Sequence, residues 1–270
     1  MSLGAEHGAM LSREELGILE EAERIFRDQG RLIRLPPEKR VIFVGDTHGD
    51  AEASGRVLST YLSADNVIVF LGDYVDRGSD SRGNLLLLLR AKVDEPEGIY
   101  LLMGNHEAWP HLPFTPADFW QSLSPGEVEL YGRVLSALPF AAHHPAGILG
   151  LHGALPDVDE LEEIEGITLG SANWRKITWG DWLDVPGYEV DPGTFGRPAF
   201  GRDYFEEVME RLGLKVLVRS HQPFAPRYLF GARCLTIFTS NAYGGTERTV
   251  AVLEPGREVR DARDLKLFYI

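Results

Sequence analysis

Short apolar runs alternate along the first half of the chain with longer stretches in which apolar residues recur at helical spacing. The runs at residues 41–44, 67–71 and 99–102 are short and apolar, and a glycine follows each within two residues. The helical stretches between them cover about residues 51–62 and 81–93. Continuous apolar strands separated by helices favour a buried, mostly parallel sheet with helical crossovers.

The second half of the chain is richer in strand patterns, which predicts two sheets packed face to face. Residues 109–138 have a mainly helical pattern interrupted by prolines. Residues 179–200 are rich in glycine, proline and aromatic residues, and we predict a long loop there that covers the functional site. The predicted strands of this half are residues 148–151, 216–218, 227–230, 235–238, 249–253 and 265–269.

The N-terminal segment is predicted to be a helical extension. Ser12 followed by Glu15 is typical of a capping box, and the helix should run from about Arg13 to Asp28. Two prolines at 36–37 separate it from the first strand. We therefore expect residues 1–37 to pack as an extension on a single domain formed by residues 38–270.

Composition and charge exclude several classes of function. The chain has 270 residues and a formal net charge of −14, so its surface repels nucleic acid and anionic membranes. Its one cysteine excludes an internal disulfide and a thiolate zinc site, and it fits a cytoplasmic protein. No apolar run approaches the roughly 20 residues that span a bilayer.

Polar clusters follow the three strands of the first half, at residues 45–48, 72–77 and 104–107. His152 and His221 follow later strands in the same way. Because ligands collect at the carboxyl ends of strands in open α/β sheets, these clusters should meet at one edge.

The side chains in these clusters suit a site for two metal ions. Asp73 can bridge the two ions with its two carboxylate oxygens, while an amide and several imidazoles complete the set. Two divalent cations and two carboxylates leave an excess positive charge that binds a phosphate dianion. Water made acidic by the metals would then supply the attacking hydroxide. The donor set accepts manganese, iron, zinc or cobalt. The candidate metal ligands are Asp46, His48, Asp73, Asn105, His152 and His221.

Three further residues fit the rest of a phosphoester hydrolysis. His106 is placed to protonate the leaving oxygen, and Asp76 should orient its imidazole and keep it protonated near neutral pH. Arg77 offers a guanidinium fork to the phosphate oxygens.

These clusters resemble the signatures of the phosphoprotein-phosphatase (PPP) family of calcineurin-like metallophosphoesterases, in the same order and at similar spacing. The second cluster, Gly-Asp-Tyr-Val-Asp-Arg-Gly, is the longest and most specific of them. The matching segments are residues 45–49, 72–78, 104–107, 152–153, 219–222 and 239–245.

The resemblance implies an α/β fold of four layers, αββα, with a central mixed β-sandwich flanked by helices. It implies one metal on Asp46, His48 and Asp73, and a second on Asp73 with Asn105, His152 and His221. It also implies that His106 and Asp76 form the acid pair and that Asn105 contacts the phosphate.

The resemblance is weaker around the rim of the site. We choose Arg197 as the second phosphate-binding arginine, with Arg202 as its competitor, and expect Tyr243 to approach the metals. Ala154 stands where the family has a glycine, and the acidic loop of eukaryotic protein phosphatases is not recognisable at residues 179–182.

The predicted function is that of a metal-dependent phosphomonoesterase, most simply a serine/threonine protein phosphatase acting on phosphorylated proteins or small phosphoesters. A nucleotide or diadenosine-polyphosphate hydrolase is the alternative, and an inactive phosphate-binding scaffold is the third hypothesis. His143 and His144 are predicted to lie in a solvated turn. Trp174, Trp179 and Trp182 are predicted to be core or lid aromatics, with substrate stacking as the other interpretation.

Overall fold

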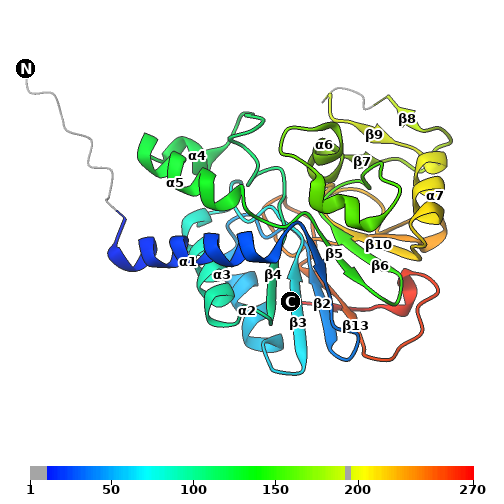
Figure 1. The fold of residues 1–270 in the computed structure, drawn as a ribbon, viewed down its shortest axis with the longest axis horizontal. Helices are drawn as coiled ribbons and strands as arrows, with labels where there is room; N and C mark the ends of the chain where they lie inside the picture. Colours follow the sequence, from blue (N-terminus) through cyan, green and yellow to red (C-terminus); the bar gives the residue numbers. More distant parts are fainter. Residues whose placement is uncertain (1–10, 192–195) are drawn as a thin grey trace, which may run out of the picture.

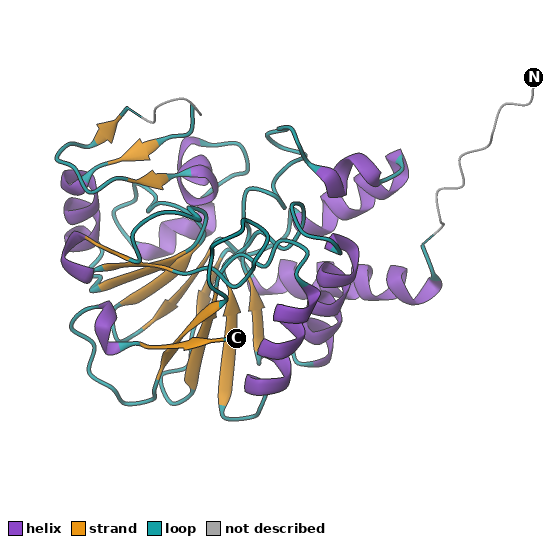
Figure 2. Ribbon diagram, turned by 180° about the vertical axis from the view of Figure 1, so that it is seen from behind, coloured by secondary structure: helices purple, strands orange, loops and turns teal. Residues whose placement is uncertain are grey.

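The computed structural model describes residues 11–191 and 196–270, and its centre is a pair of facing β-sheets (Figure 1). One sheet has six strands in the order β1-β5-β6-β10-β12-β11, and the other has five in the order β14-β13-β2-β3-β4. Helices cover the outer faces of both sheets (Figure 2). This arrangement confirms the four-layer αββα fold with a mixed central sandwich.

The two sheets draw on different parts of the chain. The five-stranded sheet combines the parallel strands β2 (Arg40–Val44), β3 (Asn66–Phe70) and β4 (Ile99–Leu101) with antiparallel β13 (Thr249–Leu253) and β14 (Lys266–Tyr269). The six-stranded sheet contains β1 (Leu32–Arg34), β5 (Ala141–His144), β6 (Ile148–Leu151), β10 (Val216–Arg219), β11 (Tyr228–Leu229) and β12 (Cys234–Thr236).

The helices lie outside the sandwich in two groups. On one side are α1 (Arg13–Gln29), α2 (Ala51–Tyr61) and α3 (Ser81–Asp94), with α4 (Asp118–Ser122) and α5 (Pro125–Leu135) beside them (Figure 1). On the other side are α6 (Ala172–Trp179) and α7 (Arg202–Arg211).

The alternating direction of side chains along each strand explains why two separate hydrophobic cores form. In β2, Val41 and Phe43 belong to the core between the sheets, whereas Ile42 and Val44 belong to the core under the helices. All four side chains are fully buried, because successive strand residues point to opposite faces and both faces are covered. Their continuous apolar pattern follows from this two-sided burial.

Gly150 in β6 permits close approach of the two sheets. A Cβ atom at this position would lie 3.0 Å from Cε1 of Phe43 in the opposite sheet. We therefore expect Gly150→Val to overpack the sandwich and lower the free energy of unfolding by about 1–3 kcal/mol in urea denaturation. The control is Gly126→Ala, where an added Cβ meets nothing within 4 Å; equal losses in both variants would contradict this explanation.

The N-terminal segment forms the predicted helix and also a strand. Helix α1 begins after Ser12 with the expected capping box, and Gly30 follows its end with φ 74°. Residues 32–34 then form β1, which pairs with β5 at the edge of the larger sheet. The division of the chain at residue 37 stays a prediction, but β1 makes part of that segment integral to the sandwich.

Two local predictions were wrong and one was confirmed in part. Within residues 109–138, α4 and α5 are helical as predicted, whereas residues 109–117, which contain Pro110, Pro113 and Pro116, form no helix. The described part of the 179–200 loop contains the short strands β7 (Asp181–Trp182), β8 (Glu189–Val190) and β9 (Ala199–Phe200), which form a third sheet. His143 and His144 end strand β5 instead of forming a solvated turn, and His144 is buried.

The tryptophans divide into two environments. Trp174 and Trp182 are buried in the core, as predicted. Trp179 is only half-buried and faces the cleft described below. Within residues 11–191 and 196–270, no helix combines the length and apolar character required to cross a bilayer.

Candidate functional site

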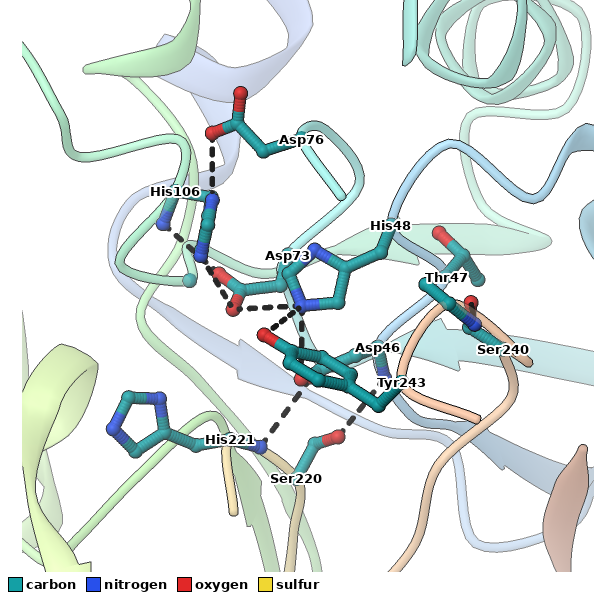
Figure 3. A network of polar contacts seen from close by, with 12 residues as sticks. Asp46, Thr47, His48, Asp73, Asp76, His106, Ser220, His221, Ser240 and Tyr243 are labelled. Atoms are coloured by element: carbon teal, nitrogen blue, oxygen red, sulfur yellow. Dashed lines mark hydrogen bonds and ion pairs between the residues drawn. The ribbon is translucent and has the colours of Figure 1, made fainter. Parts of the chain in front are cut away.

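Five loops at the carboxyl ends of strands from both sheets bring the predicted residues together. Figure 3 shows Asp46, Asp73, His106 and His221 at this edge. The loops after β2, β3 and β4 come from one sheet, and those after β6 and β10 come from the other. The sandwich therefore assembles at one edge what lies far apart in the sequence. The structure places together all six predicted metal ligands, which are Asp46, His48, Asp73, Asn105, His152 and His221.

The loop after β2 fixes Asp46 and His48. The backbone N–H of Asp46 donates to Oγ of Ser220 at 2.9 Å, and the imidazole Nδ1 of His48 lies 2.9 Å from the carbonyl oxygen of Val75. Because that carbonyl can only accept, Nδ1 carries a proton, and Nε2 is the atom that could bind a metal in exchange for its own proton. Nε2 lies 3.5 Å from Oδ2 of Asp46 and 3.6 Å from Oδ2 of Asp73.

Asp73 occupies the centre of the cluster. Its Oδ1 accepts the backbone N–H of His106 at 2.9 Å, and its Oδ2 lies 3.3 Å from Nε2 of His152. The same Oδ2 faces His48 on the other side. Asp73 thus presents one oxygen to histidines from both sheets.

The second group of donors comes from the loops after β4, β6 and β10. Nε2 of His152 lies 3.2 Å from Oδ1 of Asn105 and 3.1 Å from Nδ1 of His221, while its Nδ1 lies 3.0 Å from the carbonyl oxygen of Leu71. Two buried triads have ligand atoms within 4.8 Å of one another. They are His48, Asp73 and His106, and Asp73, His152 and His221.

The electrostatics of this cluster fit a bound cation. Oδ2 of Asp46 is buried with no hydrogen-bond partner closer than Nε2 of His48 at 3.5 Å, and so weakly paired a carboxylate oxygen is costly unless a cation meets it. Burial disfavours charge on His48, but the neighbouring Asp46 and Asp73 outweigh it and raise its pKa to about 9. Burial likewise opposes charge on Asp73, but the surrounding histidines hold its pKa well below the ordinary value. The donor set therefore suits divalent ions with nitrogen and oxygen ligands.

The backbone at the site is strained. His48, Asp73, Asp76, Arg77 and His221 all have positive φ angles, between 41° and 69°. This region is unfavourable for residues with a Cβ and persists only where the surroundings enforce it. Strain concentrated on these residues indicates that their side-chain directions are specified by the fold.

His106 forms the predicted pair with Asp76, since its Nδ1 lies 2.6 Å from Oδ2 of Asp76 (Figure 3). The other carboxylate oxygen of Asp76 accepts the backbone N–H of Phe119 at 2.7 Å. However, burial lowers the pKa of His106 in spite of Asp73 and Asp76. This lowering runs against the expectation that Asp76 keeps the imidazole protonated near neutral pH, whereas the short hydrogen bond fits the expectation that Asp76 orients the ring.

Two arginines line the mouth of the site. Nη2 of Arg197 lies 3.0 Å from Oδ2 of Asp181, and its Nη1 lies 3.3 Å from Nε2 of His221. Arg77 borders the same cleft, and its buried Nε has no hydrogen-bond partner. Arg202 instead pairs with Asp184 on an exposed surface, so the geometry favours Arg197 over this competitor.

Tyr243 approaches the cluster as expected. Its hydroxyl lies 3.5 Å from Nε2 of His48, and its ring makes an edge contact with that imidazole. Burial and the charges of Asp73 and Asp46 raise its pKa to about 12, so the phenol stays protonated at neutral pH.

An aromatic cleft of about 760 Å³ opens beside the cluster. The Phe114 ring contacts the rings of His106 and Trp179, with centroid distances of 4.7 and 5.1 Å. Phe224, which also lines the cleft, is 75% exposed. The cleft is lined by Arg77, Phe114, Thr115, Pro116, Trp179, Trp182, Leu183, Arg197, His221, Gln222, Pro223, Phe224, Ala225, Pro226 and Tyr243.

A family model described as calcineurin-like phosphoesterase matches residues 39–224. The chain belongs to the calcineurin-like phosphoesterase family. This membership confirms the resemblance that the strand-end motifs indicated. The matched range includes ten of the eleven predicted site residues, and only Tyr243 lies outside it.

Individual relatives of this phosphoesterase agree with the family. It is 30% identical over 251 residues to a probable serine/threonine-protein phosphatase of Encephalitozoon cuniculi, a match that covers 85% of the chain and 53% of that relative. The phosphoesterase thus spans about half the length of that protein.

Two solved structures are similar in fold. One is a serine/threonine phosphatase from Saccharomyces cerevisiae with similarity to human phosphatase PP5, at a TM-score of 0.80, 22% identity, and coverage of 96% and 90% of the two chains. The other is a putative diadenosine tetraphosphatase, at a TM-score of 0.57, 20% identity, and coverage of 89% and 98%. At these identities the likeness shows the fold alone.

The sequence patterns gave no role to two residues that build the phosphoesterase site. Glu107 accepts the backbone N–H groups of Asp73, Tyr74 and Gly104, and thereby clamps two strand-end loops together. Asp181 lies in the segment where the acidic loop of protein phosphatases was not recognisable, yet it contacts both Arg197 and His221. Its only sequence signal was its position in an aromatic segment after a glycine.

Proposed function

We propose that this phosphoesterase is a metal-dependent phosphomonoester hydrolase that acts on phosphoserine and phosphothreonine in proteins. The observation that carries the proposal is the convergence at one sheet edge of three groups. These are the buried metal-donor set, the His106–Asp76 pair and the guanidinium groups of Arg77 and Arg197.

The donor set divides between two metal positions. Asp46 and His48 would hold one ion, Asn105, His152 and His221 the other, and Asp73 both. When bound, the ions would polarise the phosphoryl group and lower the pKa of water. Manganese, iron and zinc all suit these ligands.

The other residues of the site would bind the phosphate and transfer the proton to the leaving group. Arg77 and Arg197 would hold the non-bridging oxygens at the mouth of the site, with Tyr243 and Asn105 beside them. Asp76 fixes the ring of His106 so that Nε2 faces the site. Burial lowers the pKa of His106, which makes its protonated form a stronger acid towards the leaving oxygen.

The cleft supports a peptide substrate over a polyphosphate. Among its lining residues only Arg77 and Arg197 carry a permanent positive charge, and Arg197 already faces Asp181. A dinucleoside polyphosphate, which carries several negative charges, would require more cations. The similarity to proteins named serine/threonine phosphatases points the same way. One observation favours the nucleotide alternative, namely that Phe114 and Trp179 offer aromatic faces to a base.

A substrate panel with manganese tests the proposal. We expect kcat/KM for a phosphothreonine peptide to exceed that for diadenosine tetraphosphate at least about tenfold, a difference of about 1.4 kcal/mol. Phenyl phosphate serves as the simple ester, and protein treated with a chelator serves as the control. A preference for the dinucleotide would support the alternative, and no turnover of any ester would indicate a phosphate-binding scaffold.

A further inference from the structure

Arg82, in the first turn of α3, joins three helices next to the acid pair. Its Nε donates to Oε1 of Glu15 in α1 at 3.2 Å, and its Nη1 donates to Oε1 of Glu127 in α5 at 3.1 Å. Its side chain is 34% exposed, and those of the glutamates are 23% and 11% exposed. We refer to these three side chains as the Arg82 junction.

Both glutamates are fixed before they meet Arg82. Glu15 forms a capping box with Ser12 at the start of α1, and Glu127 forms one with Ser124 at the start of α5. Reciprocal capping bonds hold each carboxylate at a defined place in its first turn. Two anchored carboxylates, each of which accepts one hydrogen bond from the guanidinium, therefore hold Arg82. They also hold the start of α3 at one position relative to α1 and α5.

The start of α3 in turn supports the acid pair. Ser81, the neighbour of Arg82, accepts the backbone N–H of Asp76 with its Oγ at 2.8 Å. Asp76 holds His106, and Asp76 and Arg77 both have strained positive φ angles. Such strain costs about 1–3 kcal/mol per residue and requires outside support. Ser81 supplies that support from the helix end that the junction fixes.

We propose that Arg82 is a positioning residue for the His106–Asp76 pair, and that the N-terminal helix α1 contributes to catalysis through it. The junction holds the first turn of α3, Ser81 transmits this position to Asp76, and Asp76 sets the direction of His106. This inference rests on the proposed hydrolase function, because a misplaced His106 can be detected only through a lower rate of ester hydrolysis.

The chain offers a matched control for the test. Arg90, two turns further along α3, pairs with Glu14 of α1, so it joins the same two helices away from the acid pair. Arg82→Gln and Arg90→Gln each remove one α1–α3 ion pair, and Arg82→Gln also removes the ion pair with Glu127 of α5. Thermal unfolding and metal content of both variants establish that they remain folded and loaded.

The readout is the dependence of kcat on the leaving group. For a phosphothreonine peptide, whose alkoxide leaves only with a proton, we expect Arg82→Gln to lower kcat about tenfold. For 4-nitrophenyl phosphate, whose leaving group needs little protonation, we expect a change of less than about twofold. Arg90→Gln should leave both rates unchanged. Ser81→Ala should reproduce the Arg82→Gln effect, and the double variant should lose less than the product of the two.

Equal kcat values for Arg82→Gln and Arg90→Gln on the peptide would overturn the inference. So would equal losses on both substrates, which would indicate general loosening of the site. If the wild-type protein hydrolyses neither ester, the proposed function fails instead, which distinguishes the two outcomes.

Discussion

Replacing His106 by asparagine is expected to lower kcat on a phosphothreonine peptide by about 10²–10⁴-fold, the usual contribution of a positioned general acid. An asparagine amide can still donate to Asp76, whose Oδ2 lies 2.6 Å from Nδ1 of the histidine, but it brings no proton to the leaving oxygen. Steady-state kinetics with manganese measures the effect. Metal content, measured by elemental analysis, should stay close to that of the wild-type protein.

Two results would contradict this role for His106. Turnover of the peptide at the wild-type rate would remove it from the proton transfer. A loss of metal that accounts for the lost activity would make it a ligand, because it also belongs to the triad with His48 and Asp73. The loss on 4-nitrophenyl phosphate should be smaller than on the peptide, since that leaving group needs less protonation.

Asp73→Asn should reduce occupancy of both metal positions. Oδ2 of Asp73 faces His48 on one side and His152 on the other, so one neutralised carboxylate weakens both donor groups. An amide also lacks the charge that two cations need between them. Elemental analysis after dialysis should show less than half of the wild-type metal, with a correspondingly large fall in kcat.

The unfolding temperature provides a second measurement for Asp73→Asn. Manganese should raise it in the wild-type protein, because a ligand that binds the native state stabilises it, and should do so much less in the variant. The control is Asp76→Asn, which removes a buried carboxylate 2.6 Å from His106 but outside the donor set. Unchanged metal stoichiometry in Asp73→Asn would refute its bridging position.

The residues that local pattern predicted are those at the ends of parallel strands. Asp46, Asp73 and Asn105 each follow the glycine that comes after an apolar run, and the register of β2, β3 and β4 brings those ends together. His152 and His221 followed from the same rule in the second sheet. A strand fixes the position of the few residues that follow it, so their place in the sequence was sufficient to predict that these side chains lie at the site.

Residues held by long-range contacts were not predictable in this way. Asp181 lies in a segment whose strands are two residues long, so no periodicity marked it. Nothing in the sequence pattern indicated that Glu15 would meet Arg82, because 67 positions separate them. The pKa of His106 also depended on how deeply the ring is buried, and burial outweighed the carboxylate that the motif suggested.

The positive φ angles at the site have a consequence for how such a chain would change if its activity were no longer selected. Asparagine and glycine adopt this backbone at lower cost than histidine or arginine. Substituting either at His48, Arg77 or His221 should therefore relieve strain in the metal-free fold while removing a functional side chain. Because these replacements stabilise the fold, we expect them early in a lineage that had lost catalysis. Glycine or asparagine at one of these positions, in a relative that keeps the rest of the fold, would identify a protein that descends from an enzyme but is no longer active.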